Sequence, residues 1–231
     1  MCTVSYLPRP GGSIVTANRD ESPLRNADGL SSYSNKNDQE FLIAKEPLYG
    51  GTNLAIGKEF TTVLLNGAFF PHESKLNYRK SRGLVVLDSL NLSSLNNFHK
   101  DALDGVEPFT LLRFGKVIEE LRWDESVVHF RTYDSTKPLI VGSAKLYSRE
   151  ALEKRQVWFE DLLYPDAPGR REIWNFHVQG GDGDPENDMV MNRFNMVCTV
   201  SVSQVYSSQG KKKVRHLDLI RNQSEEIILE L

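Results

Sequence analysis

Hydrophobic and polar residues alternate along most of this chain. In residues 127–133, Val128 and Phe130 alternate with His129 and Arg131, which is the period of two of a half-buried antiparallel strand. His129 lies on the polar phase, so we expect it at the surface. Similar short runs predict strands at residues 1–7, 13–21, 41–43, 54–57, 61–65, 108–114, 117–123, 127–133, 139–143, 197–206 and 213–220, with residues 225–231 as an edge strand or a frayed end.

Hydrophobic spacing of three and four residues is confined to two parts of the chain. Ser148 is the expected N-cap of one of the helices that this spacing predicts, and the polar residues 22–40 predict a loop. The order of strands, helices, strands, helices and strands predicts an α+β fold, a four-layer αββα sandwich with mostly antiparallel sheets. The expected helices are residues 81–91, 93–103, 148–163 and 170–179.

The length and composition are those of an ordinary globular protein. A chain of 231 residues with 39% hydrophobic residues can bury a sizeable core without disulfides or metals. Layered folds of this length are often one domain, so we expect a single domain over residues 1–231. The net charge of −3 and a lysine run, Lys211 to Lys213, without interleaved aromatic residues argue against a nucleic-acid partner.

The cysteine count and the hydropathy pattern bear on the compartment. Cys2 and Cys198 are the only cysteines, which excludes a disulfide scaffold and favours a reducing compartment. No apolar run approaches the roughly 18 residues of a membrane span, and the first residues do not have a signal-peptide pattern. We therefore expect a soluble, cytoplasmic protein without a membrane span, whose oligomeric state the sequence leaves open.

The most acidic stretch, residues 180–188, invites a calcium interpretation. An EF-hand loop needs a glycine at its sixth position and a later bidentate glutamate. Asn187 occupies that glycine position, and no suitable glutamate follows. We therefore expect a solvated loop, and neither a metal nor a cofactor.

The first twenty-one residues predict a hairpin that gathers reactive groups. If Leu7 pairs with Ser13, Cys2 lies opposite Asn18, and the Arg-Asp pair at residues 19–20 leaves the second strand beside the start of the chain. Removal of Met1 would leave Cys2 with an α-amine of pKa about 7.7–8.0 and a thiol of pKa about 8.5. An amine of this kind can act as the base for its own side chain. Alternatively, Cys2 is a small strand hydrophobe and residues 19–20 are a surface pair.

Several motifs together resemble the NRDE family, also called the transport-and-Golgi-organisation protein family. The resemblance covers about the first ninety residues. That family in turn resembles cysteine-type N-terminal nucleophile (Ntn) hydrolases such as bile-salt hydrolases and penicillin V acylases, which have an αββα sandwich and cleave linear amides. The motifs are Met1-Cys2-Thr3, Thr16 to Pro23 with its Asn-Arg-Asp-Glu tetrapeptide, Gly50-Gly51-Thr52, Leu64-Leu65-Asn66 and Ser81-Arg82-Gly83.

The resemblance implies a set of catalytic residues. It implies Cys2 as the nucleophile, Arg19 and Asp20 as its neighbours, and Asn66 as an oxyanion donor. A second polar group occurs late in the chains of these hydrolases, and Ser143 is the nearest counterpart here. Read by itself, Asn66 followed by glycine is also the signature of a simple type I′ turn.

Two positions depart from the family pattern. Asn53 stands where a tryptophan is frequent, and Gly67-Ala68 replaces a frequent Tyr-Arg pair. They leave open the identity of the substrate. The function we expect is hydrolysis of a small-molecule amide, or of a related acyl group, at a carbon–nitrogen bond other than a peptide bond. The alternative is a non-catalytic binding or trafficking protein that handles lipid, acyl-CoA or haem.

Overall fold

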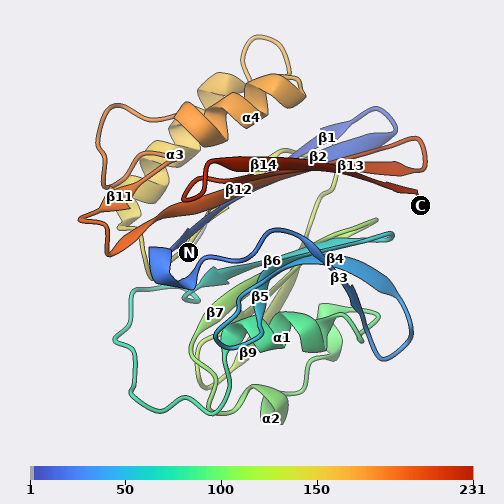
Figure 1. Ribbon diagram of the computed structural model, residues 1–231, viewed down its shortest axis with the longest axis vertical. Coiled ribbons are helices and arrows are strands. Elements are labelled where there is room, and N and C mark those ends of the chain that lie inside the picture. The colour runs from blue at the N-terminus through green and yellow to red at the C-terminus, as the bar shows by residue number, and fades with distance from the viewer. Residues whose placement is uncertain (1–2, 231) are drawn as a thin grey trace. The chain divides into compact units, whose positions relative to one another are not determined.

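Antiparallel strands are the main secondary structure of this protein, seen in a computed structural model that describes residues 3–230 (Figure 1). The strands make two seven-stranded sheets. Each sheet belongs to one of two compact units, and both units are built from separate stretches of the chain. Unit 1 comprises residues 3–26, 137–142 and 147–230, and unit 2 comprises residues 27–136 and 143–146.

The sheet of unit 1 has the order β10-β1-β2-β12-β13-β14, and β11 pairs with β12. Two helices and a 3-10 turn complete the unit. The elements are β1 (Thr3–Arg9), β2 (Gly12–Glu21), η1 (Pro23–Arg25), β10 (Leu139–Gly142), α3 (Arg149–Leu162), α4 (Arg170–Gln179), β11 (Asn192–Arg193), β12 (Val197–Ser208), β13 (Lys211–Asp218) and β14 (Gln223–Glu230).

The predicted hairpin is formed by β1 and β2, with a register one residue from the expected one. Leu7 pairs with Ile14, and Thr3 pairs with Asn18. The reason is a two-residue turn, in which Pro10 restricts φ and Gly11 adopts a φ of +73°. Cys2 lies outside the described residues.

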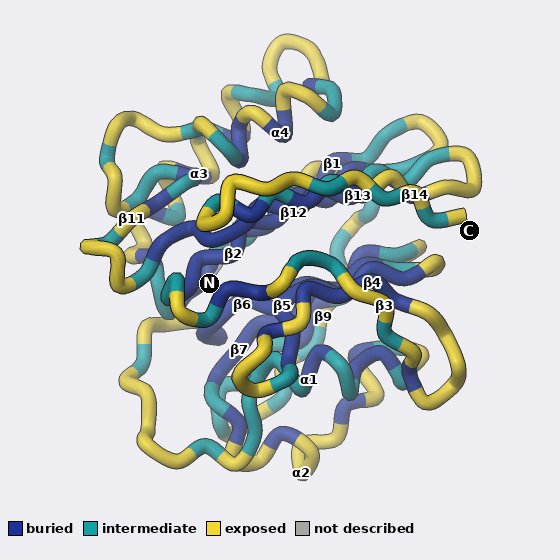
Figure 2. The backbone as a smooth tube through the Cα atoms, in the orientation of Figure 1, coloured by how far each residue is buried: buried dark blue, intermediate teal, exposed yellow. Residues whose placement is uncertain are grey.

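Helices α3 and α4 cover one face of the unit 1 sheet (Figure 1). Ser148 caps α3 as predicted, because its side chain accepts a hydrogen bond from the Ala151 amide at 3.2 Å. The strand β2 is buried at eight successive positions, Ile14 to Glu21, and is therefore buried on both faces (Figure 2). The apolar cluster between helices and sheet contains Leu7, Ile14, Phe159, Ile173, Phe176 and Met189.

The sheet of unit 2 has the order β3-β4-β5-β6-β7-β8-β9, so neighbours in space are also neighbours in sequence. Each β pairing in it is antiparallel. The elements are β3 (Ser31–Ser34), β4 (Glu40–Lys45), β5 (Thr52–Gly57), β6 (Thr61–Asn66), α1 (Arg82–Ser89), η2 (Leu95–Asn97), α2 (Lys100–Leu103), β7 (Phe109–Phe114), β8 (Ile118–Trp123) and β9 (Val128–Tyr133).

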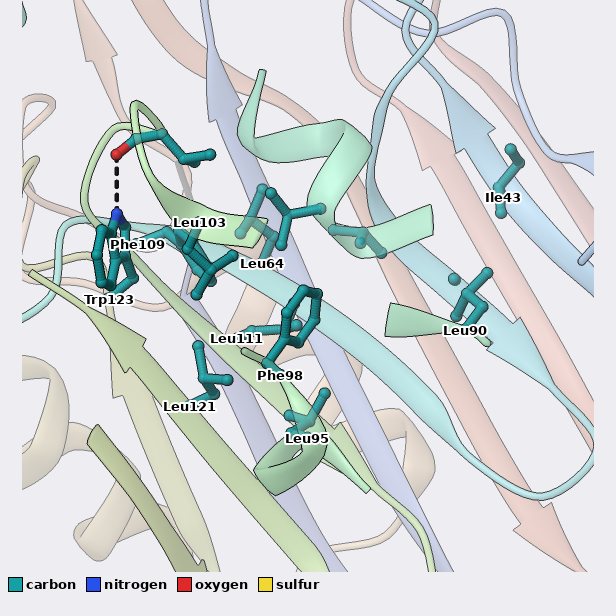
Figure 3. Packing of buried hydrophobic residues seen from close by; sticks show 14 of the residues in the cluster. Ile43, Leu64, Leu90, Leu95, Phe98, Leu103, Phe109, Leu111, Leu121 and Trp123 are labelled. Carbon is teal, nitrogen blue, oxygen red and sulfur yellow. Dashed lines mark hydrogen bonds between the residues drawn. The ribbon is translucent and has the colours of Figure 1, made fainter. Parts of the chain in front are cut away.

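A large apolar cluster fills the space between α1 and the unit 2 sheet (Figure 3). Trp123 is wholly buried, and its indole N–H donates to the Val106 carbonyl at 2.9 Å. Polar groups of buried aromatic side chains normally find such a partner. His129 is exposed on β9, as the alternation predicted.

The predicted four-layer αββα sandwich is wrong. Strands make up 41% of the structure and helices 18%, so the structure is mainly antiparallel β, with two sheets and few helices. The main reason lies in residues 93–103, where the predicted helix is replaced by η2 and by the four-residue α2. Ser94 accepts a hydrogen bond from the Asn96 amide there and closes a short turn. With eight residues in α1 and four in α2, unit 2 has no full helical layer over the described residues.

Candidate functional site

Asp20 is one of the predicted site residues that lie in unit 1. It lies near the end of β2 with 0% of its surface exposed. Its carboxylate accepts hydrogen bonds from the Tyr147 hydroxyl and the Thr199 hydroxyl, each at 2.6 Å. Burial, followed by the charge of Asp20, raises the pKa of Tyr147 well above its usual value, so the phenol stays a donor. The carboxylate therefore has a fixed orientation.

A buried arginine stands behind this carboxylate. Arg155, on α3, is 1% exposed, and its guanidinium lies 3.8 Å from the centre of the Tyr147 ring. It donates to the Thr3 hydroxyl and to the main-chain carbonyls of Asn187 and Asp188. Oxygen acceptors and an aromatic face compensate for the loss of water around this cation. Arg155 thus contacts Tyr147, and Tyr147 contacts Asp20, in the interior of unit 1.

A second buried network joins α4 to the hairpin. The His177 Nε2 atom lies 2.7 Å from the Ser5 hydroxyl, and its Nδ1 atom bonds the side-chain oxygen of Asn18. Because the Asn18 amide nitrogen donates to two carbonyls, its oxygen faces His177 and must accept. Nδ1 therefore carries the proton, and Ser5 donates to Nε2. Burial, with a contribution from Arg155, lowers the pKa of His177 to about 3.

This Ser-His-Asn order is that of a hydrolase triad, but its surroundings are not. Ser5, His177 and Asn18 are each at most 1% exposed. A nucleophile has to reach its substrate, and Ser5 is enclosed between the sheet and α4. The network is therefore a structural link between β1, β2 and α4.

Arg19 is adjacent to Asp20 in sequence but has different contacts. It is 5% exposed and donates to the Arg25 carbonyl at 2.9 Å. Successive residues of a strand point to opposite faces of the sheet, which places Arg19 on the face opposite Asp20. The positive charge of Arg19 contributes, after burial, to the lowered pKa of His216 on β13. The predicted gathering of Arg19 and Asp20 around Cys2 cannot be followed to the thiol, because Cys2 lies outside the described residues.

Asn66 and Ser143 meet in unit 2. Asn66 ends β6, and its main-chain carbonyl accepts from the Ser143 hydroxyl at 2.7 Å and from the Lys145 amide at 3.2 Å. Its side-chain oxygen is buried and accepts no hydrogen bond from the described residues. Gly67 follows with a φ of +81°, and an added Cβ there would lie 2.6 Å from the Lys145 nitrogen. Backbone and Ser143 together hold Asn66 rigidly.

The alternative interpretation of Asn66 as part of a two-residue hairpin turn does not hold. The next strand of this sheet, β7, begins only at Phe109. A type I′ turn also needs positive φ at both central residues, and only Gly67 of this pair has it. Asn66 is thus a strand-end residue, as the resemblance implied.

Next to Asn66 lies a cluster of charges that sequence patterns did not indicate. The Glu107 carboxylate contacts Arg82 at 3.0 Å, His72 at 3.2 Å and the Lys145 ammonium group. Burial opposes ionisation of Glu107, but Arg82 and Lys145 outweigh it and hold its pKa at about 2. The cluster ties the segment of Ser143 and Lys145 to the start of α1.

Each unit therefore assembles part of the predicted set. Asn66 and Ser143 are in contact within unit 2, while Arg19 and Asp20 are consecutive residues of β2 in unit 1. Helical spacing places Arg155 on the inward face of its helix, but no sequence pattern indicates Tyr147 or Thr199. Tyr147 and Thr199 are 127 and 179 residues from Asp20, and no local pattern marks them.

Two broader features complete the description. Over residues 3–230, no group of three or more His, Cys, Asp or Glu side chains is arranged to hold a metal ion. In the acidic loop, the Asp188 carboxylate accepts from the amides of Asp182 and Gly183, so part of this charge serves the loop itself. Among the helices in the same range, none has the length and apolar character to cross a membrane.

The comparisons with known proteins add no family to this picture. No protein-family model matches the chain, and no curated protein matches it. The likeness to the NRDE family therefore depends on the quoted motifs alone.

Proposed function

We propose that this protein is a cysteine N-terminal nucleophile hydrolase that cleaves a linear amide or a related acyl group through Cys2. The observation that carries the proposal is the position of Thr3. This residue is wholly buried and pairs with Asn18 on one side and Gly142 on the other, inside the sheet rather than at its edge. Chain ends usually lie at the surface and fray unless they are tied down. Cys2 is the covalent neighbour of this anchored residue.

The chemistry would follow from the two groups of Cys2 itself. After removal of Met1, the α-amine takes the thiol proton, and the thiolate attacks the substrate carbonyl. The tetrahedral intermediate collapses as the carbon–nitrogen bond breaks, and the leaving amine takes the proton from the α-ammonium group. Water then hydrolyses the thioester and restores the thiol. The resemblance implies Asn66 as the oxyanion donor, and such a donor commonly contributes about 3–4 kcal/mol.

The remaining residues would act by positioning. Asp20, whose carboxylate accepts from Tyr147 and Thr199, would orient the α-amine of Cys2, and Arg19 would favour the thiolate. The Ser143 hydroxyl already donates to the Asn66 carbonyl at 2.7 Å. We therefore assign Ser143 the role of holding Asn66, not direct contact with the substrate.

The test compares the two cysteines of the chain. Intact mass reports whether Met1 is removed, and a thiol-reactive acyl probe at pH 7.5 reports the reactive sulfur. We expect a mass without Met1 and labelling that Cys2→Ala abolishes. Cys198→Ala is the matched control. It keeps Cys2 and should therefore label as fully as the wild type. Burial, followed by the charge of Asp20, raises the pKa of the Cys198 thiol, so we expect this sulfur to contribute little to the labelling.

Two outcomes would overturn the proposal. A retained Met1 would remove the free amine, and labelling unchanged by Cys2→Ala would remove the nucleophile. Either result, together with a lipid or acyl ligand that copurifies, would instead support the non-catalytic binding or trafficking function.

A further inference from the structure

A cavity of about 930 Å³ lies in unit 1, beside the start of β12. Sites for small molecules generally measure about 300–1,000 Å³. Its apolar wall comes from separate stretches of the chain and includes Leu24, Met191, Met196, Leu219 and Ile220. Leu24 is 94% exposed, Met196 67% and Ile220 45%. Single exposed apolar residues are common, but here three of them border the same hollow.

The chemistry of the lining favours an uncharged ligand. No lysine, arginine, histidine, aspartate or glutamate lines the cavity. Cys198 is its one ionisable side chain among the described residues, and burial raises the pKa of that thiol. A charged ligand would lose water here and gain no opposite charge in return.

Among the polar side chains of the lining, that of Asn195 offers a hydrogen-bond donor to a ligand. The Thr199 hydroxyl is already used, since it donates to Asp20 and accepts from the Met191 amide. The Asn195 side-chain oxygen accepts from Asn192 at 2.8 Å. Its side-chain nitrogen, Nδ2, donates no hydrogen bond within residues 3–230, and it is therefore available to a ligand that carries an acceptor.

The turn that carries Asn195 is rigid and strained. Phe194 and Asn195 have φ values of 54° and 55°, a region that costs a bulky L-residue roughly 1–2 kcal/mol. The main-chain N–H of Asn195 donates to the Asn192 side-chain oxygen at 2.8 Å, and the main-chain N–H of Met196 donates to the Arg193 carbonyl at 3.0 Å. Strain of this kind often accompanies binding sites, where it pre-organises a contact surface.

We infer that this cavity is a binding site for an uncharged, largely apolar small molecule that carries a hydrogen-bond acceptor such as a carbonyl. Ile220, Met196 and Leu24 bind its apolar part, and the Asn195 amide donates to its acceptor. The inference goes beyond the proposed function, because it involves neither Cys2 nor turnover.

The experiment uses the full chain and two fluorescent probes. Prodan is an uncharged naphthalene with one ketone, and 1-anilinonaphthalene-8-sulfonate is an anion of similar aromatic size. We expect saturable Prodan binding with a blue-shifted emission, and at least tenfold weaker binding of the anion. Ile220→Asp should weaken Prodan binding at least tenfold. Ile228→Asp, the same substitution at a 60% exposed position on β14 outside the cavity lining, should leave it unchanged.

A second variant tests the donor and does not depend on tolerance of Ile220→Asp. Asn195→Asp keeps the acceptor for Asn192 and removes the amide donor, so it should weaken Prodan binding about threefold or more. The inference is overturned if Prodan binds equally well to Ile220→Asp and Ile228→Asp, if Asn195→Asp binds as wild type, or if the anion binds as tightly as Prodan. Self-association that Ile220→Asp abolishes, without Prodan binding, would instead identify a protein contact surface.

Discussion

In unit 1, two hydroxyl groups donate to the Asp20 carboxylate, whereas in unit 2 two arginines bind the Glu120 carboxylate directly. Asp20 is 0% exposed, and these two donors, the Tyr147 and Thr199 hydroxyls, are neutral. Glu120 is 2% exposed but accepts from Arg122 at 2.8 Å and Arg131 at 2.6 Å. The Arg131 side chain is 55% exposed.

Because their partners differ, the two carboxylates should differ in how much stability the protein loses when each is removed. In unit 1 the partners of Asp20 are buried and cannot turn to water, so removal of the carboxylate leaves them unsatisfied. In unit 2 the Arg131 side chain is 55% exposed and can be hydrated again, while that of Arg122 is 16% exposed. The two units also differ in the groups that make stability depend on pH. Unit 1 contains a buried neutral histidine, His177, whereas in unit 2 arginines hold the Glu120 carboxylate ionised.

The largest effect is expected at Asp20. Asp20→Ala leaves the buried Tyr147 and Thr199 hydroxyls without the carboxylate to which they donate and removes a buried negative charge, which should lower the free energy of unfolding by about 3–5 kcal/mol. Glu120→Ala is the matched change in unit 2 and should cost about 1–3 kcal/mol. Urea unfolding followed by tryptophan fluorescence and circular dichroism measures both. Equal losses in the two variants would contradict the contrast between the units.

The next largest effect is expected on the free energy of unfolding at acidic pH. The pKa of His177 is about 3 in the folded protein and about 6.5 when unfolded, so the unfolded chain binds the proton first as pH falls. Stability should therefore decrease below pH 6.5, by about 2 kcal/mol at pH 5 from this group. His177→Gln should remove that part of the slope. The check is the difference in unfolding free energy between wild type and variant at pH 7 and pH 5; a constant difference would show that His177 is not the group responsible.

A smaller effect is expected at Glu107. Its pKa of about 2 lies below its usual value, so its stabilising contribution is present above pH 4.5 and is lost as pH falls toward 2. Glu107→Gln should cost about 1–2 kcal/mol at pH 7. Thermal unfolding at pH 7, 4 and 2.5 would show the difference from wild type shrinking. A difference that persists at pH 2.5 would mean that ionisation of Glu107 is not its source.

The smallest effect is expected at a solvated ion pair of α3. Arg149 and Glu153 lie 2.7 Å apart, but their side chains are 92% and 61% exposed. Arg149→Ala should change the unfolding free energy by less than about 0.5 kcal/mol. A loss above about 1 kcal/mol in the same urea assay would show that exposure is a poor guide to the strength of ionic contacts in this protein.

Strand positions were largely predictable because alternation is a local property. β7, β8, β9 and β12 lie where the alternation predicted strands, and α3 and α4 lie where helical spacing predicted helices. β3 was missed inside the predicted loop at residues 22–40, since its sequence, Ser-Ser-Tyr-Ser, is polar and mostly exposed. An edge strand of this kind is held by its pairing with β4, which its own residues do not reveal.

The candidate site was predictable only where short motifs occur. The motifs led to Asp20 and Asn66, and to Ser143, which contacts Asn66 across 77 residues of chain. The charge cluster around Glu107 and the cavity beside β12 carry no motif. They depend on side chains from distant segments whose meeting only the folded chain establishes.

By itself, the sequence determined the hairpin at the start of the chain, the Ser148 cap of α3 and most strands, because each depends on neighbouring residues. Only the tertiary structure decided that Tyr147 and Thr199 orient Asp20, that Arg155 lies behind the phenol, and that His177 stays neutral. The physical reason is the same in each case. Burial of a polar group is tolerated only when a partner from elsewhere in the fold arrives at hydrogen-bond distance, and that arrival depends on packing rather than on local pattern.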